Sequence, residues 1–184
     1  MEIVGSESHE YSGTYPCRVP VWWGRFSEPG PHPQLDGVTG KLVLLRIEKR
    51  FNRFERLLAK LFRAPREVRR PLDRLNSMLW ELCDGTREFE EVCRHMDATF
   101  NEEMAPVVDR TYTGIEALRT RNLMTVLKEP YARKWNTGPG IVPKHQTLGQ
   151  LDGTIDIDST PTHEGEHPII EDNPQGHEPD VQSS

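Results

Sequence analysis

The apolar positions of residues 72–85 recur at the spacing of an α-helix. They lie three or four residues apart, at Leu75, Met78, Leu79 and Leu82. Asp73 precedes them as an N-cap, and Gly85 follows them as a residue that adopts the left-handed conformation at low cost. The pattern therefore predicts a helix over residues 73–84.

The same spacing predicts two further helices, at residues 88–100 and 104–121. The apolar stripe of the first consists of Phe89, Val92, Cys93 and Met96. Glu90 and Glu91 lie in its first turn, where the helix dipole favours anions. The stripe of the second consists of Met104, Val107, Val108, Thr111, Ile115 and Leu118. Pro106 is expected in the first turn of that helix, where proline is tolerated.

Runs rich in β-branched, aromatic and other apolar residues predict the strands. The first is expected over residues 19–26, and the second, more continuously apolar, over residues 41–47. A third is expected over residues 66–72, where Val68, Arg70 and Leu72 alternate with their neighbours. Residues 124–127 form a short closing strand in this prediction. The fold class is then α+β, with a three-stranded antiparallel sheet and a three-helix bundle.

An additional amphipathic helix is predicted over residues 51–62, between the second and third strands. One side is apolar, with Phe51, Phe54, Leu57, Leu58, Leu61 and Phe62; the other is basic, with Arg53, Arg56 and Lys60. Outside this core, polar and proline-rich composition predicts disorder for residues 1–14 and for an acidic tail, residues 130–184. The folded domain is expected to span residues 15–129.

The segment that contains the first two predicted helices, 73–84 and 88–100, resembles a known family. Its residues match the PqqD-like pattern at Leu72, Asp73, Leu75, Leu79, Trp80, Leu82, Cys83, Asp84, Gly85 and Val92. The end of the last helix, Leu-Arg-Thr-Arg-Asn-Leu at 118–123, is similar to the family's Leu-x-x-x-Gly-Leu, with Asn122 in place of glycine. From Leu72 to Leu123 the chain thus resembles PqqD-like domains, which are small, winged-helix-like and also called RiPP recognition elements.

The resemblance implies a non-catalytic, peptide-binding adaptor. Such domains bind a precursor peptide as an extra strand and deliver it to a radical SAM or other modifying enzyme; the family's namesake serves pyrroloquinoline quinone (PQQ) biosynthesis. Transferred to this chain, the edge strand supplies Arg66, Val68, Arg69 and Arg70, and the helix wall supplies Val108, Tyr112, Ile115 and Arg119. The arginines would suit an acidic peptide. Pro71 would remove one ladder bond if it faces the peptide.

Charge adds two alternatives to this interpretation. The net charge is −6, but residues 41–74 carry twelve basic and four acidic side chains, an excess of +8. This basic band is consistent with a nucleic-acid surface or with peripheral membrane contact through residues 51–62. It is also consistent with simple solvation of a helix face. The expected recognition helix at 104–121 carries Asp109 and Glu116 beside its arginines, which argues against nucleic acid.

No catalytic or metal-binding constellation is evident. His163 and His167 have the spacing of metal ligands, but they lie in the predicted tail, where solvated histidines are the simpler interpretation. Cys83 and Cys93 fall on apolar helix faces and are expected to be buried thiols. No enzymatic activity and no cofactor are therefore expected. Without a signal-like N-terminus or a long apolar run, a cytoplasmic protein is expected.

Overall fold

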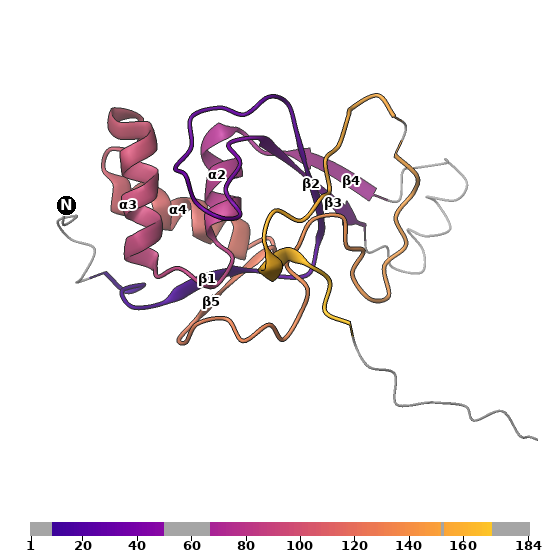
Figure 1. Cartoon of the computed structure of the whole chain (residues 1–184). Coiled ribbons are helices and arrows are strands. Elements are labelled where there is room, and N and C mark those ends of the chain that lie inside the picture. Colours follow the sequence, from indigo (N-terminus) through magenta and orange to yellow (C-terminus); the bar gives the residue numbers. More distant parts are fainter. Residues whose placement is uncertain (1–8, 50–66, 152, 171–184) are drawn as a thin grey trace, which may run out of the picture.

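A computed structural model describes residues 9–49, 67–151 and 153–170 (Figure 1). The fold is α+β, as predicted. The strands are β1 (Tyr15–Arg18), β2 (Trp22–Phe26), β3 (Leu42–Glu48), β4 (Glu67–Pro71) and β5 (Met124–Leu127). The helices are α2 (Arg74–Leu82), α3 (Phe89–Phe100) and α4 (Val107–Arg119), with 3₁₀ turns η1 (Asn101–Met104) and η2 (Glu164–Glu166).

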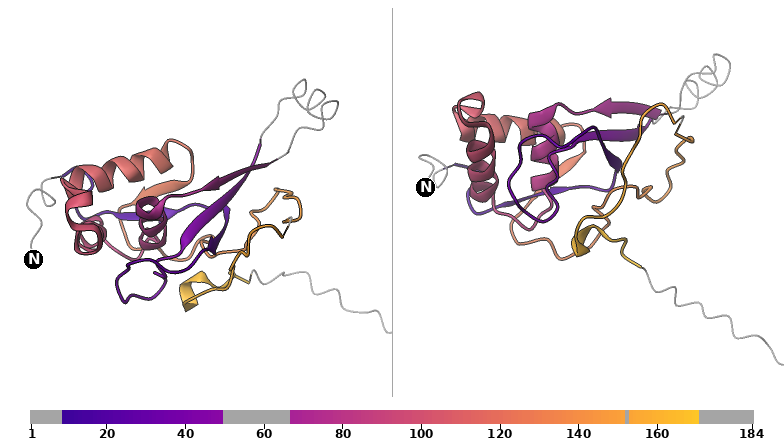
Figure 2. Two further views of the ribbon diagram at one scale, coloured as in Figure 1. Left: turned by 90° about the horizontal axis from the view of Figure 1, so that it is seen from above. Right: turned by 45° about the horizontal axis from the view of Figure 1, so that its top comes forward.

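Two antiparallel sheets organise the chain. A three-stranded sheet has the order β2-β3-β4, and β1 pairs with β5 in a second, two-stranded sheet. Helices α2, α3 and α4 lie together on one side of the larger sheet, while the β3–β4 pair extends beyond them (Figure 2). The predicted three-stranded antiparallel sheet and the three helices are thus confirmed.

Helix α2 lies at the centre of the hydrophobic core. Its N-cap is Asp73, whose side chain accepts the Asn76 N–H at 2.8 Å, and Gly85 has a φ of +84° beyond its end. Burial extends past the predicted stripe, because α2 contacts the sheet on one side and α3 and α4 on another. Trp80, which lies off the predicted stripe, is fully buried against Trp23 of β2, with ring centroids 6.2 Å apart.

The strand predicted over residues 19–26 is present as β2 but begins only at Trp22, and β1 was not predicted. Residues 15–18 form β1 and residues 22–26 form β2, and the two belong to different sheets. Pro20 lies between them and has no N–H to donate to a ladder. The Val19 N–H instead donates to the Leu123 carbonyl at 3.2 Å, which carries the chain from one sheet to the other.

The last predicted helix is shorter than expected. Met104 belongs to the turn η1, and Pro106 is the N-cap of α4, so the helix begins at Val107 rather than at residue 104. Asn122 takes the left-handed conformation after the helix, with a φ of +55°, a conformation that asparagine tolerates better than most residues.

The chain ends contain more ordered structure than composition predicted. Among residues 9–14, Tyr11 is buried and its ring contacts those of Phe89 and Tyr112, with centroids 5.7 and 5.0 Å away. At the other end, residues 136–151 and 153–170 form a loop across the sheet, which we call the strap (Figure 1). Its Glu166 is fully buried. The expected disorder of residues 9–14 and 130–170 is therefore corrected.

Three predictions concern segments that lie outside the described residues. They are the disorder of residues 1–8, the amphipathic helix at 51–62 and the terminal part of the acidic tail, residues 171–184. The central portion of the basic band, residues 50–66, lies outside them as well.

Candidate peptide-binding edge

The edge strand expected to bind a peptide corresponds to β4. It pairs with β3 on one side, in the register Leu45 opposite Arg70 and Ile47 opposite Val68. Residues 68–71 are all exposed, and among them the apolar side chain of Val68 is 36% exposed. Arg66, the first predicted site residue, lies outside the described residues.

The direction of each backbone group along β4 follows from one hydrogen bond. The Leu72 N–H donates to the Val43 carbonyl at 2.8 Å, so the backbone of Leu72 faces β3. In an antiparallel pair this direction alternates with every residue. Arg70 and Val68 therefore also face β3, whereas Arg69 and Glu67 direct their N–H and C=O groups away from the sheet.

Pro71 falls in the outward-facing set. Because it has no N–H, the outward-facing N–H groups of β4 are those of Glu67 and Arg69, and Pro71 contributes only its carbonyl. The missing ladder bond noted in the sequence is thus on the side that an added strand would occupy.

The side chains of β4 divide between the two faces of the sheet. Val68 and Arg70 share the helix-bearing face with Ile47 and Leu45, to which they are paired. Glu67 and Arg69 lie on the opposite face, where Arg46 and Arg69 both bind the Glu67 carboxylate, at 2.8 and 3.1 Å. Burial alone would raise the pKa of Glu67, but these hydrogen bonds outweigh it and lower the pKa below its ordinary value.

The helix residues of the predicted site have other surroundings. Ile115 is fully buried and Val108 is 9% exposed, and both belong to the hydrophobic core. Tyr112 contacts the Tyr11 ring, and the Arg119 guanidinium donates to the Tyr11 hydroxyl and to Glu116, each at 2.9 Å. In Figure 2, β4 begins far from the helices and approaches them only toward its C-terminal end. The structure therefore does not join the predicted edge strand and the predicted helix residues into one continuous binding surface.

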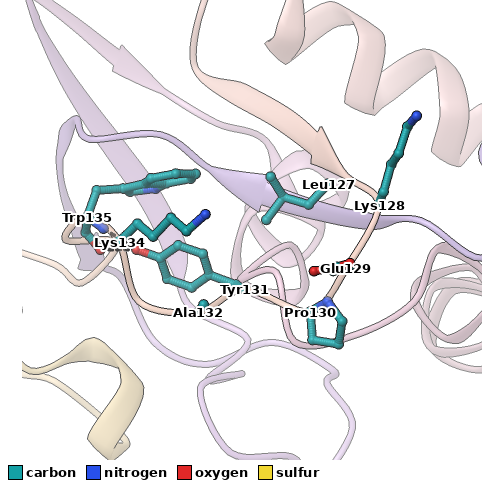
Figure 3. A pocket seen from close by; sticks show the side chains of 8 residues that line it. All are labelled: Leu127, Lys128, Glu129, Pro130, Tyr131, Ala132, Lys134 and Trp135. Atoms are coloured by element: carbon teal, nitrogen blue, oxygen red, sulfur yellow. Dashed lines mark hydrogen bonds between the residues drawn. The ribbon is translucent and has the colours of Figure 1, made fainter.

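A pocket of about 230 Å³ lies elsewhere, at the end of β5 (Figure 3). It is lined by Leu127, Lys128, Glu129, Pro130, Tyr131, Ala132, Lys134 and Trp135. The Tyr131 and Trp135 rings are 4.9 Å apart, and the Trp135 indole N–H donates to the Arg18 carbonyl at 2.9 Å. The lining is one continuous stretch of chain and includes none of the predicted binding residues.

The thiols of the chain are buried, as predicted for Cys83 and Cys93. Cys17, Cys83 and Cys93 are each 0% exposed and unpaired. Burial raises the pKa of Cys17 and of Cys93 to about 12, and it raises the pKa of Cys83 well above its ordinary value. These groups are therefore neutral thiols near pH 7 rather than nucleophilic thiolates.

The described residues contain no group of histidine, cysteine and carboxylate side chains that could hold a metal ion. His163 instead caps η2, accepting the Gly165 N–H on Nδ1 at 3.1 Å. In the same part of the chain, no helix has the length and apolar character needed to cross a membrane. Comparison with family models, curated proteins and solved structures finds no match for this chain.

One charged cluster was missed by the sequence analysis. Arg18, Arg25, Glu81 and Glu166 are almost completely buried around Trp23. They come from β1, β2, α2 and the strap, so no local spacing connects them. The available signal was a pair of arginines at the first apolar stretch, residues 19–26: Arg18 lies next to it and Arg25 inside it.

Proposed function

We propose that the chain is a non-catalytic adaptor that binds an extended partner peptide at the outer edge of β4. This is the function that the resemblance to winged-helix-like PqqD domains implies, with delivery of the peptide to a modifying enzyme such as a radical SAM enzyme. The observation that supports it best is the exposed strand whose Glu67 and Arg69 N–H groups face away from the sheet.

Strand addition fits the chemistry of this edge. A peptide that pairs with β4 gains backbone hydrogen bonds, and its alternate side chains provide specificity. The peptide side chains on the helix-bearing side contact Val68 and Arg70. Val68 favours an apolar peptide residue, and Arg70 favours an acidic one two positions away. On the other side Glu67 already engages Arg69, so the positive charge of Arg69 is partly compensated. Arg70 is therefore the proposed acidic-residue contact.

Binding in this proposal needs none of the predicted helix wall. Ile115 and Val108 belong to the hydrophobic core, and Tyr112 and Arg119 contact Tyr11. Peptide contact is assigned to Val68, Arg69 and Arg70.

A display library of extended peptides tests the proposal, with Arg69→Pro and Arg69→Ala as the matched pair. Both variants lack the arginine side chain, but only the proline also lacks the outward N–H. We expect peptides selected on the wild-type chain to lose at least about tenfold in affinity with Arg69→Pro compared with Arg69→Ala. Fluorescence anisotropy measures the difference. Equal affinities for the two variants would exclude strand addition at this edge.

The same proteins distinguish the alternatives suggested by the basic band. Binding to duplex DNA or to anionic vesicles should weaken steeply as salt rises, whereas a complex held by backbone hydrogen bonds should weaken less. Strongly salt-dependent DNA or vesicle binding that is insensitive to Arg69→Pro would favour a nucleic-acid or membrane function instead.

A further inference from the structure

The outer edge of β2 is already paired, within the same chain. Because backbone directions alternate along a strand, the backbone N–H and C=O groups of Trp23 and Arg25 face outward on this edge. Arg25 and Asp158 exchange two backbone hydrogen bonds of 2.7 Å each, and the Gly140 N–H donates to the Trp23 carbonyl at 2.8 Å. Two pieces of the strap thus occupy the edge as an added strand would.

One side chain anchors the strap to the sheet. The Glu166 carboxylate accepts from Arg25 Nη2 at 2.8 and 3.1 Å, and from the backbone N–H and hydroxyl of Thr162 at 2.9 and 3.0 Å. Arg25 and Glu166 are both 0% exposed. A charged pair this deeply buried is stable only because each group is hydrogen-bonded.

The rest of the fold, which we call the body, does not balance the charges of this site without the strap. The guanidinium groups of Arg18 and Arg25 both lie over the Trp23 ring, 4.8 and 4.7 Å from its centroid. Arg25 Nε donates to Glu81 at 2.7 Å, so the body supplies two positive charges and one negative charge. The second carboxylate comes from the strap. We call Arg18, Trp23 and Arg25 the clamp.

Arg18 has donors that the strap does not use. It is 1% exposed, and its Nη1 donates to the Trp80 carbonyl at 3.2 Å. Its Nε and Nη2 have no acceptor among the described residues, and Glu166 Oε1 lies 3.7 Å from Nη2. The clamp therefore has N–H donors suited to a carboxylate, and the Glu166 carboxylate accepts from only some of them.

The two ends of the strap lie next to each other. The Ile169 N–H donates to the Asn136 side chain, and Gly138 is so close to the Glu166 backbone that a Cβ there would collide with the Glu166 carbonyl oxygen. A loop whose ends meet can leave the sheet without unfolding the elements it covers.

We propose that the β2 edge and the clamp form a second strand-addition site, specific for an extended peptide that carries a carboxylate. Its resident ligand is residues 154–170 of the same chain, with Glu166 as the anchoring side chain. In this proposal residues 154–170 leave the β2 edge while the helices and β4 stay folded. The site contains none of the residues of the proposed β4 edge, although Gly149, in the other piece of the strap, donates its N–H to the Glu67 side chain of β4 at 3.1 Å.

Hydrogen exchange of the full chain tests the separate opening. The Arg25 and Asp158 amides report on the strap, and the Leu72 and Cys83 amides report on the body. In the wild-type chain, we expect the strap amides to exchange at least about tenfold faster than the body amides. Glu166→Gln should bring the strap amides close to unprotected rates while the body amides stay protected.

A second variant opens the strap without changing charge. Gly138→Ala creates the collision with Glu166 and should give the same exchange pattern. The controls are Glu164→Gln, at an exposed position of the same segment, and Gly149→Ala, where a Cβ meets only Glu67 at 3.9 Å. Both controls should retain wild-type protection. Strap and body amides that exchange at one common rate in the wild-type chain and in both opening variants would overturn the proposal.

A labelled synthetic peptide of residues 154–170 tests the site itself. We expect it to bind the Glu166→Gln chain at least about tenfold more tightly than the wild-type chain, in which the strap competes. It should also restore protection at the Arg25 amide. The same peptide with glutamine at position 166 should bind at least about tenfold more weakly. Absence of binding to the folded Glu166→Gln chain, or equal binding of the two peptides, would overturn the assignment.

Discussion

Val68 and Arg69 are neighbours on β4, but their backbones face opposite directions. The Val68 N–H faces β3, whereas the Arg69 N–H faces outward, as the Leu72–Val43 hydrogen bond requires. A proline at each position therefore has a different physical effect, even though both residues are exposed.

Proline substitution should thus separate stability from binding. Val68→Pro removes a β3–β4 hydrogen bond and leaves the Ile47 carbonyl without its donor, so we expect a loss of about 1–3 kcal/mol in the free energy of unfolding. Arg69→Pro removes only an outward N–H and should cost less than half as much. Urea unfolding of both variants measures the difference. A larger loss for Arg69→Pro would contradict the assigned backbone directions.

The cysteines give a second prediction at the residue scale. Because burial keeps Cys17, Cys83 and Cys93 protonated and inaccessible, iodoacetamide at pH 8 should label none of them in the folded chain. All of them should react after denaturation in urea. Mass spectrometry counts the adducts, and rapid labelling of the native chain would show that at least one thiol is accessible.

Among the elements, the helices followed the apolar pattern closely. The predicted caps Asp73 and Gly85 bound α2, and α3 begins at Phe89 with Glu90 and Glu91 in its first turn. Helical periodicity and caps are local properties of the chain, so they could be read from the sequence. By contrast, β1 was not predicted and the start of β2 was placed too early, because Arg18 and Val19 have backbone partners more than 60 residues away, at Cys83 and Leu123.

Leu82→Ala tests the register of α2. Leu82 is fully buried, so its truncation should lower the free energy of unfolding by ~2–5 kcal/mol. Leu75, on the same stripe but only partly buried, is the matched control, and Leu75→Ala should cost clearly less. Thermal and urea unfolding measure both. Equal losses would mean that the burial of the two positions is not as described.

The whole molecule differs from its sequence-based prediction mainly in the strap. Composition predicted a disordered tail, but the strap covers the β2 edge and supplies Glu166 to the clamp. The conformational entropy lost on ordering the strap is offset by a few specific contacts rather than by an apolar core of its own.

Truncation should reveal this contribution. A chain that ends at Trp135 loses the carboxylate beside Arg25 and the strand at the β2 edge, so we expect its thermal midpoint to fall by about 5–10 °C. A chain that ends at Ile170 retains every contact described above and serves as the control. Calorimetry compares the two. An unchanged midpoint for the shorter chain would mean that the strap adds nothing to stability.

Acid should loosen the strap through Asp158. The Thr160 N–H and the Lys41 ammonium stabilise the Asp158 carboxylate and lower its pKa from 3.8 to about 2. The resulting stabilisation is complete above the unfolded pKa and is lost as the pH falls through the folded value. Protection of the Arg25 amide should therefore fall between about pH 4 and pH 2.

Asp158→Asn should reduce that dependence, whereas Asp156→Asn, at an exposed neighbouring position, should preserve it. Some dependence should remain, because the pKa values of Glu67 and Glu116 are also lowered. Hydrogen exchange at several pH values measures the slopes, and equal slopes in the two variants would contradict the role of Asp158.

The sequence by itself determined the α+β class, the three helices with most of their limits, and the positions of β3 and β4. These follow from side-chain periodicity, capping and β-branched composition, which act over a few residues. The pairing of the β2 edge, the direction of the Arg69 N–H and the carboxylate partners of Arg18 and Arg25 became evident only from the tertiary structure. These properties depend on pairing between distant segments, and Glu166 lies 141 positions beyond Arg25, too far for any local pattern to connect them.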